Sequence, residues 1–394
     1  MAGLTTTGAV LGAPQSEAAA SPAVPVHGSV AQGYESVRVA FAQAMAADPG
    51  GGQLCIYRHG RPVVDLWTGR DPFGDRPLTG DTLSILMSCT KGVASTCAHM
   101  LVERGQLDLD APVAKYWPEF AANGKAEIPV AWLLSHKAGL AEFPPEAGID
   151  SWKWVDWELC TRTLAAMKPM WEPGTAFMYH AFTFGWLIGE VIRRVTGELP
   201  GQFVAEQISG PLGLDLHLGL PEALESRVAP EFEPGKRPDE GALAVLNTRA
   251  GHAAQIPAAN AIGNARSLAK MYAAMLGPVD GVRLLKAETV ERARRPQTDG
   301  LDWPPPRQDS KTFPQRWALG YDTSRAGSPM LGPTSFGHNG GGGRLGFADP
   351  ASGTAAGFVV NYMSWGGSAT GPDPRWTPWL AALQSVVARS GSQP

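Results

Sequence analysis

The chain has 394 residues, of which 44% are hydrophobic and 18% are charged, and its formal net charge is −4. This composition is typical of a globular protein with ample material for a core. The sequence contains no basic run, which argues against nucleic acid as a partner. It also contains no stretch long and apolar enough to span a membrane.

The N-terminal segment 1–28 is rich in small residues and proline and contains no lysine or arginine. A secretory signal peptide begins with a basic region, so we expect a flexible leader instead. The four cysteines, at positions 55, 89, 97 and 160, have the spacing of neither a disulfide framework nor a metal site. Free thiols in this number suit a reducing compartment, and we therefore expect a cytoplasmic protein.

The first elements alternate between helix and strand. Apolar spacing over 34–47 predicts an amphipathic helix. Two β-rich runs, 53–58 and 62–68, flank a short glycine-containing turn and predict a β-hairpin. A long apolar helix then starts at Ser88 and ends near Gly105, a residue type that favours helix C-termini.

The middle of the chain, 106–249, carries more helix signals, including a short apolar helix at 130–136 and a longer one at 184–195. Three tryptophans lie between these two helices, at positions 152, 154 and 157. The simplest interpretation of this cluster is core packing under a loop. The alternative is a wall of an apolar acyl or alcohol pocket.

The last third of the chain returns to strands and ends with a helix. We expect strands at 316–321, 344–348 and 355–362 and a helix at 376–389. An early hairpin and three late strands favour one antiparallel sheet built from both ends of the chain, in an α+β fold. We divide the chain into an α/β domain, 29–105 plus 250–394, and a mainly helical inserted domain, 106–249.

A candidate nucleophile stands at the start of the long apolar helix. Ser88 and Lys91 are three residues apart and therefore lie on nearly the same helix face. Lys91 can take the Ser88 proton if burial lowers the lysine pKa from about 10.4 towards neutrality. The segment 267–270 has the same Ser-x-x-Lys spacing, but we interpret it as the start of an amphipathic surface helix with Ser267 at or near the N-cap. The apolar context therefore favours Ser88.

Two further segments can complete a serine hydrolase. Tyr179 follows a turn at 171–174 that would place it on an exposed loop. A tyrosine beside a lysine ammonium can titrate below its usual pKa of about 10 and so shuttle protons. The glycine-rich segment 337–343 predicts a strand edge whose N–H groups can approach a substrate closely. With the N–H of Ser88, this edge would bind an oxyanion.

These three elements, in this order, resemble the serine β-lactamase and penicillin-binding-protein superfamily, particularly the class C β-lactamase-like family VIII carboxylesterases. Supporting likenesses lie at 134–140, 179–186 and 263–269. The resemblance covers about residues 30–390 and implies a β-lactamase-like fold.

The resemblance also implies a role for each matching residue. Ser88 would be the acylated nucleophile, with Lys91 and Tyr179 acting together as general base and then general acid. The N–H groups of Ser88 and Gly341 would form the oxyanion hole. The substrate-binding residues, in the place of the Lys-Thr-Gly motif of β-lactamases, would be His338, Asn339 and Gly340.

Two departures from β-lactamases bear on the substrate. Ala181 stands where the tyrosine motif usually ends in asparagine, and His338 replaces the lysine of Lys-Thr-Gly. The lysine helps to hold the carboxylate of a β-lactam, and a mostly neutral histidine does this less well. We therefore expect cleavage of small-molecule carboxylic esters through an acyl-serine intermediate, with weak or no β-lactam hydrolysis.

The sequence also bears on several alternatives to this function. The sequence has no Gly-x-Ser-x-Gly elbow, which disfavours a Ser-His-Asp hydrolase. Its eight histidines are scattered, so we expect no metal and no cofactor, and we interpret His136 and His180 as structural. A non-catalytic acyl-binding or scaffold member would be expected to lose part of the Ser-Lys-Tyr set, which is complete here. Whether water, an alcohol or an amine accepts the acyl group stays open between an esterase, an acyltransferase and an amide or peptide hydrolase.

Overall fold

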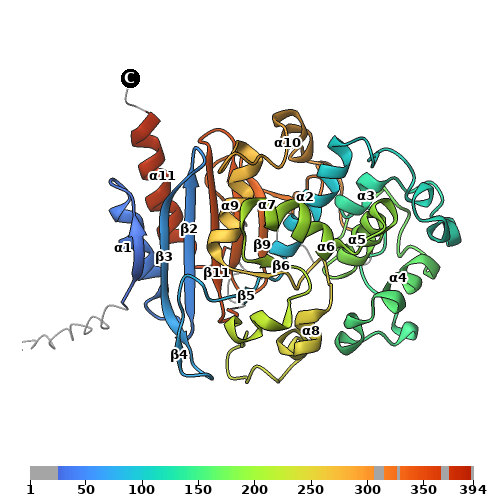
Figure 1. The fold of residues 1–394 in the computed structure, drawn as a ribbon. Coiled ribbons are helices and arrows are strands. Elements are labelled where there is room, and N and C mark those ends of the chain that lie inside the picture. Colours follow the sequence, from blue (N-terminus) through green and yellow to red (C-terminus); the bar gives the residue numbers. More distant parts are fainter. Residues whose placement is uncertain (1–24, 306–314, 326–328, 365–371, 392–394) are drawn as a thin grey trace, which may run out of the picture.

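The computed structural model describes residues 25–305, 315–325, 329–364 and 372–391. Its central feature is an antiparallel sheet with the strand order β1-β3-β2-β11-β10-β9-β8 (Figure 1). The short strand β4 pairs with the C-terminal end of β3. The strands are β1 (His27–Val30), β2 (Gly51–Arg58), β3 (Arg61–Asp71), β4 (Arg76–Pro77), β8 (Asp322–Thr323), β9 (Phe336–Gly340), β10 (Arg344–Asp349) and β11 (Thr354–Val360).

The order of the strands confirms the prediction of one sheet built from both ends of the chain. The late strand β11 pairs with the early strand β2, with Gly357 opposite Cys55. The predicted hairpin is β2–β3, and His59 and Gly60 both have positive φ at its turn (47° and 75°). A two-residue turn of this kind matches the twist of the strands that it joins.

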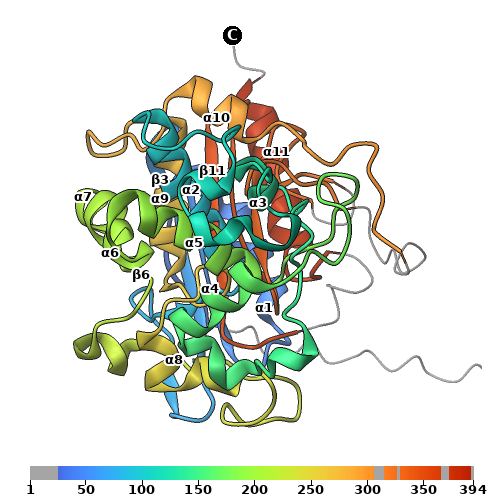
Figure 2. The same cartoon turned by 90° about the vertical axis from the view of Figure 1, so that its right-hand side faces the viewer.

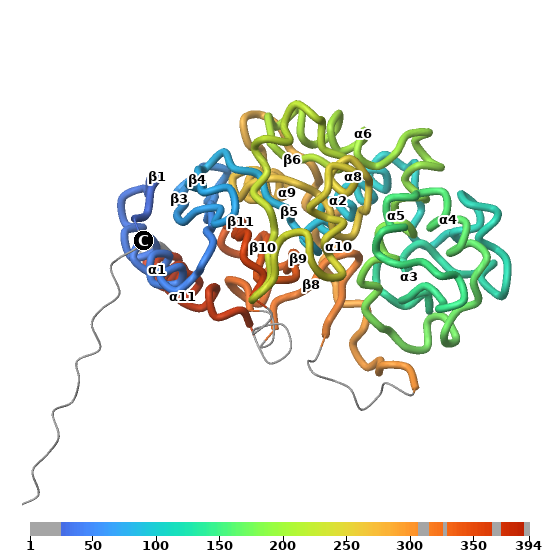
Figure 3. Tube along the Cα trace, turned by 90° about the horizontal axis from the view of Figure 1, so that it is seen from below, coloured from blue at the N-terminus to red at the C-terminus, as the bar shows by residue number. Residues whose placement is uncertain are grey.

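Helices cover both faces of the sheet. On one face, α1 (Glu35–Met45) packs beside α11 (Thr377–Gly391), as Figures 1 and 3 show. On the other face, α9 (Ala265–Leu276) crosses β2, β10 and β11. An added Cβ at Gly357 would lie 2.5 Å from the carbonyl oxygen of Ala265. This glycine therefore lets α9 approach the strand closely.

The remaining helices form the other side of the molecule, with α4, α5 and α6 turned towards the viewer in Figure 2. These helices are α2 (Cys89–Glu103), α3 (Val130–Leu134), α4 (Trp157–Ala166), α5 (Thr183–Thr196), α6 (Pro200–Val204), α7 (Gly210–Leu212), α8 (Arg249–Ala253) and α10 (Ala287–Ala293). Short 3₁₀ turns lie at Val113–Lys115, Pro118–Gly124, Pro145–Ala147, Ser151–Val155, Glu222–Arg227 and Ala244–Asn247, and one π turn lies at Ala205–Ser209.

A second, small sheet links the helical part to the start of α2. Its order is β5 (Ser84–Ile85), β7 (Ile262–Gly263) and β6 (Leu216–His217). Strand β5 ends three residues before Ser88, so this sheet fixes the point at which α2 begins. No helix among the described residues is long and apolar enough to cross a membrane.

Three local predictions were wrong. Residues 316–321 form a loop rather than a strand, because Gly320 has a φ of 86° and donates its N–H to Leu134. Helix α9 is buried against the sheet instead of lying on the surface, and its N-cap is Asn264, whose side chain accepts the N–H of Ser267. Strand β1 begins inside the predicted leader, of which residues 1–24 lie outside the described part of the chain.

Candidate active site

Ser88 lies at a sharp turn between β5 and α2. The preceding residue, Met87, has a φ of 47°, a left-handed conformation that is uncommon for a residue with a side chain. After this turn, the N–H groups of Cys89 and Thr90 bond back to the carbonyls of Leu86 and Met87. Within the described residues, the N–H of Ser88 itself has no acceptor. It is therefore available to a ligand.

Lys91 lies one turn along α2 and is fully buried. Its Nζ is 3.2 Å from the Ser88 Oγ and donates to the carbonyl oxygens of Ala181 (2.7 Å) and Ala258 (3.0 Å). It also lies 4.7 Å from the centre of the Tyr179 ring. The predicted Ser-Lys pair is thus in hydrogen-bonding contact.

The electrostatic surroundings of Lys91 favour its neutral form. Burial removes the ammonium from water and lowers the pKa of Lys91 well below its usual value. Among the described residues, no carboxylate forms an ion pair with Lys91 to oppose this effect. A neutral amine beside a serine hydroxyl has a lone pair that can accept the serine proton.

Tyr179 lies in the loop that leads into α5, and its position corrects two predictions. The loop is largely buried rather than exposed, since Ala176, Phe177 and Met178 are all covered. Burial raises the pKa of Tyr179 above its usual value, and this effect outweighs the opposing hydrogen bond with the Ser88 side chain. The phenol therefore keeps its proton and is a neutral donor rather than a phenolate.

Two buried histidines hold the loop on either side of Tyr179. The N–H of His180 donates to the Nδ1 of His136 (3.2 Å), and the Nε2 of His180 accepts from the N–H of Leu140 (3.1 Å). The Nδ1 of His180 must then carry the proton that it donates to the carbonyl of Met178, 2.7 Å away. Burial lowers the pKa of His180 to about 4 and that of His136 well below its usual value. Both rings are neutral parts of the scaffold, which supports their structural interpretation.

The glycine-rich segment lies directly against the start of α2. The thiol of Cys89 donates to the carbonyl of His338 (3.1 Å), and an added Cβ at Gly340 would lie 2.6 Å from the Leu86 oxygen. Gly340 ends β9, and Gly341 begins the turn that follows. Gly341 and Ser88 are therefore carried by two segments in contact, and the N–H of Gly341, like that of Ser88, has no acceptor among the described residues.

The other two predicted substrate-binding residues, His338 and Asn339, have different surroundings. His338 is buried, and its Nδ1 lies 2.6 Å from the carbonyl of Asn339, which fixes the proton on that nitrogen. Its Nε2 has no hydrogen-bond partner in the described part of the chain, and burial lowers the pKa of His338 to about 3. Asn339 is the next residue along β9, so its side chain leaves the strand on the opposite face.

Trp317 belongs to the site but carried no signal in the sequence. Its ring stacks on Tyr179, with centroids 5.0 Å apart and planes 4° apart, and lies 5.4 Å from the His338 ring. The centre of its ring also lies 4.5 Å from that of His136, with the two planes 67° apart. Sequence analysis placed Trp317 in a strand, and no local motif marks it. Only the fold brings this loop beside the tyrosine.

The predicted tryptophan cluster divides into three environments. Trp154 stacks on Phe182 at 3.9 Å, next to the Ala181 carbonyl that binds Lys91. Trp157 donates to Glu190 on α5, which is a structural role, and Trp152 is 56% exposed. The core-packing interpretation therefore fits Trp157, whereas Trp154 packs on the residue that follows Ala181, whose carbonyl accepts from Lys91.

Comparison with known proteins adds independent findings. A family model described as Beta-lactamase matches residues 37–376. The esterase/beta-lactamase LipL of Mycobacterium tuberculosis is 36% identical over 344 residues, which are 80% of this chain and 77% of that protein. A solved family VIII carboxylesterase has a TM-score of 0.81 at 34% identity, covering 92% of this chain and 100% of the other. EstA from Arthrobacter nitroguajacolicus has a TM-score of 0.81 at 32% identity, covering 92% and 99%.

Proposed function

The chain belongs to the beta-lactamase family, and from that premise we propose that it is a serine carboxylesterase that cleaves small-molecule esters through an acyl-Ser88 intermediate. The observation that carries this proposal is the buried amine of Lys91, which lies 3.2 Å from the Ser88 hydroxyl and forms no ion pair with a carboxylate of the described residues. The names of LipL and of the family VIII carboxylesterase support ester substrates.

Acylation in this proposal begins with proton transfer from Ser88 to the neutral Lys91. The Ser88 Oγ attacks the ester carbonyl carbon, and the carbonyl oxygen becomes an oxyanion that accepts from the N–H groups of Ser88 and Gly341. The C–O bond to the alcohol then breaks. The departing alkoxide takes a proton from the Tyr179 hydroxyl, which is replenished by the Lys91 ammonium.

Deacylation reverses the same steps with water in place of the alcohol. Lys91 and Tyr179 remove a proton from water, the hydroxide adds to the acyl carbon, and the Ser88 oxygen leaves with the proton returned to it. The raised pKa of Tyr179 suits this role, because a neutral phenol can donate to the leaving oxygen while Lys91 restores its proton. We take water as the acceptor, with alcohols and amines as competitors to be tested.

The neutral His338 argues for esters over β-lactams. A protonated lysine attracts the carboxylate of a β-lactam, whereas the Nε2 of His338, which no described residue contacts by a hydrogen bond, is a lone-pair acceptor that offers no positive charge. We expect a chromogenic cephalosporin to turn over far more slowly than a good ester. Equal steady-state rates for the two substrates would refute this part of the proposal.

We also place the activity in the cytoplasm. All four cysteines are buried and free, which supports a reducing compartment.

The test of the proposal is intact-protein mass spectrometry after mixing with a short p-nitrophenyl ester or a fluorophosphonate. We expect a mass gain in the wild type that is absent in Ser88→Ala. The matched control is Ser267→Ala, which removes the other serine with the Ser-x-x-Lys spacing and should label like the wild type. Labelling that survives in Ser88→Ala would identify a different nucleophile, and an unlabelled wild type would refute the esterase function. Added alcohols or amines that divert the acyl group would identify a transferase.

A further inference from the structure

The turn 341–343, which joins β9 to β10, is held from behind by three side chains. Its three carbonyls accept, in chain order, from the Nη1 of Arg344 (2.8 Å), the Nη2 of Arg375 and the Nε1 of Trp376 (2.8 Å). Three consecutive glycines have little conformational preference of their own. These hydrogen bonds therefore determine the shape of the turn.

A backbone hydrogen bond within the turn leaves the N–H of Gly341 directed away from it. This N–H shares a peptide unit with the carbonyl of Gly340, which accepts from the N–H of Gly343 at 3.1 Å. In a trans peptide, the N–H and C=O point to opposite sides. With the Gly340 carbonyl directed into the turn, the Gly341 N–H must point outwards.

Arg344 connects the two segments that carry the oxyanion donors. Its guanidinium is fully buried; Nε donates to the carbonyl of Ile85 (3.2 Å), and Nη1 donates to that of Gly341. Ile85 lies three residues before Ser88. The third nitrogen forms an ion pair with the buried Glu231. A rigid, planar group thus sets the spacing between the Ser88 segment and the glycine turn.

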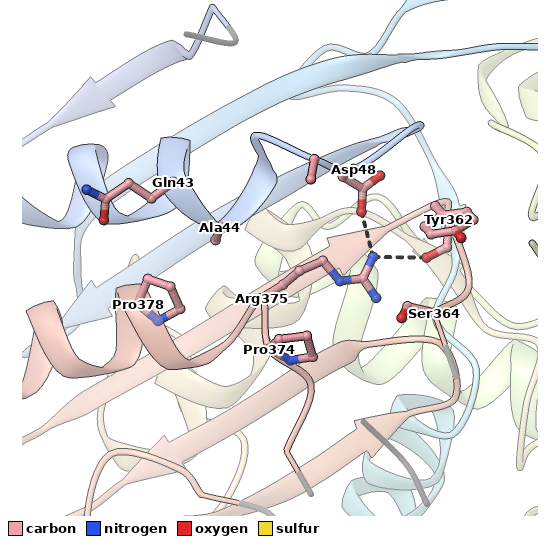
Figure 4. Close-up of a pocket in the computed structure, with 9 residues that line it drawn as sticks. Gln43, Ala44, Asp48, Tyr362, Ser364, Pro374, Arg375 and Pro378 are labelled. Carbon is pink, nitrogen blue, oxygen red and sulfur yellow. Dashed lines mark hydrogen bonds and ion pairs between the residues drawn. The ribbon is translucent and has the colours of Figure 1, made fainter. Parts of the chain in front are cut away.

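Arg375 connects the turn to other segments of the protein, and Figure 4 shows its contacts with Asp48 and Tyr362. Its Nη1 lies 2.7 Å from Asp48 and 3.1 Å from the Tyr362 carbonyl, and its Nε and Nη2 bond to Asp373. Two carboxylates therefore compensate one buried guanidinium. Arg375 is a fixed anchor for the Gly342 carbonyl, and its charge is already satisfied within the protein.

We propose that Arg344 and Arg375 are positioning residues for the oxyanion hole, and this proposal rests on the esterase function given above. Losing one oxyanion donor costs about 10²–10³ in kcat, and displacing a group by about 1 Å can cost about 10². Arg344→Lys and Arg375→Lys should each lower kcat by about 10–100-fold. KM should stay within about twofold, because the full oxyanion contact is made only in the transition state.

The test uses a p-nitrophenyl ester for kcat and KM, and an aryl trifluoromethyl ketone for oxyanion binding. The ketone forms a tetrahedral adduct with serine whose oxygen occupies the hole, so its inhibition constant should rise in proportion to the fall in kcat. The matched control is Asp349→Asn at the other end of β10, a buried carboxylate bonded to Thr334, Ser335 and Ser352. This variant should lose thermal stability but keep both kcat and the inhibition constant.

Milder variants keep the test decisive if an arginine variant does not fold. Glu231→Gln removes the charge that pairs with Arg344, and Trp376→Phe removes only the Nε1 donor to the turn. Both should lower kcat and ketone affinity together. Folded variants with the wild-type kcat and the wild-type ketone affinity would overturn the proposal. A fall in kcat with unchanged ketone affinity would also overturn it.

Fluorophosphonate labelling separates the two proposals. Labelled Ser88 in variants with unchanged kcat would refute only the positioning role. An unlabelled wild type would refute the esterase function and the positioning role with it.

Discussion

Replacing Lys91 by methionine should change both the activity and the way in which stability depends on pH. Methionine has similar length but no amine, so the variant should lose the base and fall by about 10²–10⁴ or more in kcat. Among the residues that the structure describes, the wild-type amine bonds only to Ser88 and to two backbone carbonyls, and burial lowers its pKa. In the unfolded chain the same lysine returns to a pKa of about 10.4.

The sign of the stability effect follows from proton counting. Between the lowered pKa of folded Lys91 and about 10.4, the unfolded chain binds one more proton than the folded protein. The free energy of unfolding therefore rises with pH across this window, by about 1.4 kcal/mol per pH unit for one proton. Below the lowered pKa and above about 10.4 this contribution is flat. Lys91→Met lacks this titrating group. The difference in the free energy of unfolding between the wild type and Lys91→Met should therefore increase with pH by this amount.

The assay is urea unfolding of both proteins between about pH 6 and pH 10, beside the pH profile of wild-type kcat/KM with an uncharged ester. Because the neutral amine is the active form, kcat/KM should rise with pH through the same pKa at which the stability slope begins. Other groups of the site stay out of this range. Burial lowers the pKa of His338 to about 3 and that of His180 to about 4, and it raises the pKa of Tyr179.

Lys125 offers a matched control. It is also buried, its Nζ bonds to the carbonyls of Ala122 (2.7 Å) and Met167 (2.5 Å), and burial lowers its pKa to about 8. Lys125→Met should remove a stability slope that begins near pH 8 while leaving kcat unchanged. Parallel stability profiles for the wild type and Lys91→Met would mean that Lys91 is charged in the fold. The assignment of Lys91 as the base would then be wrong.

Three further substitutions probe the tyrosine loop. Tyr179→Phe should lower kcat by about 10²–10⁴ with little change in Tm, and a variant with wild-type kcat would exclude the phenol from proton transfer. His136→Leu leaves the N–H of His180 without its acceptor and should cost about 1–3 kcal/mol in urea unfolding; an unchanged midpoint would contradict that role. Trp317→Leu removes the stacking partner of Tyr179, worth about 0.5–1.5 kcal/mol, and should lower kcat as well as stability. Wild-type kcat in that variant would show that the stack does not position the phenol.

The parts of the fold and site that the sequence predicted depend on local patterns. The hairpin β2–β3 follows from two β-rich runs around a short turn, and α2 follows from a continuous apolar stretch with Gly105 just beyond its end. The contact between Ser88 and Lys91 follows from helix geometry alone once α2 is predicted. Each of these features needs only residues that are close together in the chain.

The parts that the sequence did not predict depend on contacts between distant segments. Helix α9 has an amphipathic pattern, but nothing within residues 265–276 shows that β10 and β11 carry glycines that allow it to pack closely. The direction of the pKa shift of Tyr179 could not be predicted, because its burial comes from the Trp317 loop and from α2. In the same way, the role of Arg344 depends on Ile85 and Glu231, which are more than a hundred residues away in the chain.

The arrangement of charge around the site follows from what the proposed mechanism requires of Lys91. A carboxylate beside Lys91 would stabilise the ammonium and remove the base, and the described residues place none in contact with it. Its partners are carbonyl dipoles, and the histidines nearby are neutral at physiological pH. The charged side chains that hold the turn 341–343 are paired with each other and not with Lys91. Arg344 pairs with Glu231, and Arg375 pairs with two aspartates. In the proposed mechanism, buried ion pairs can therefore hold the oxyanion donors without protonating the base that activates Ser88.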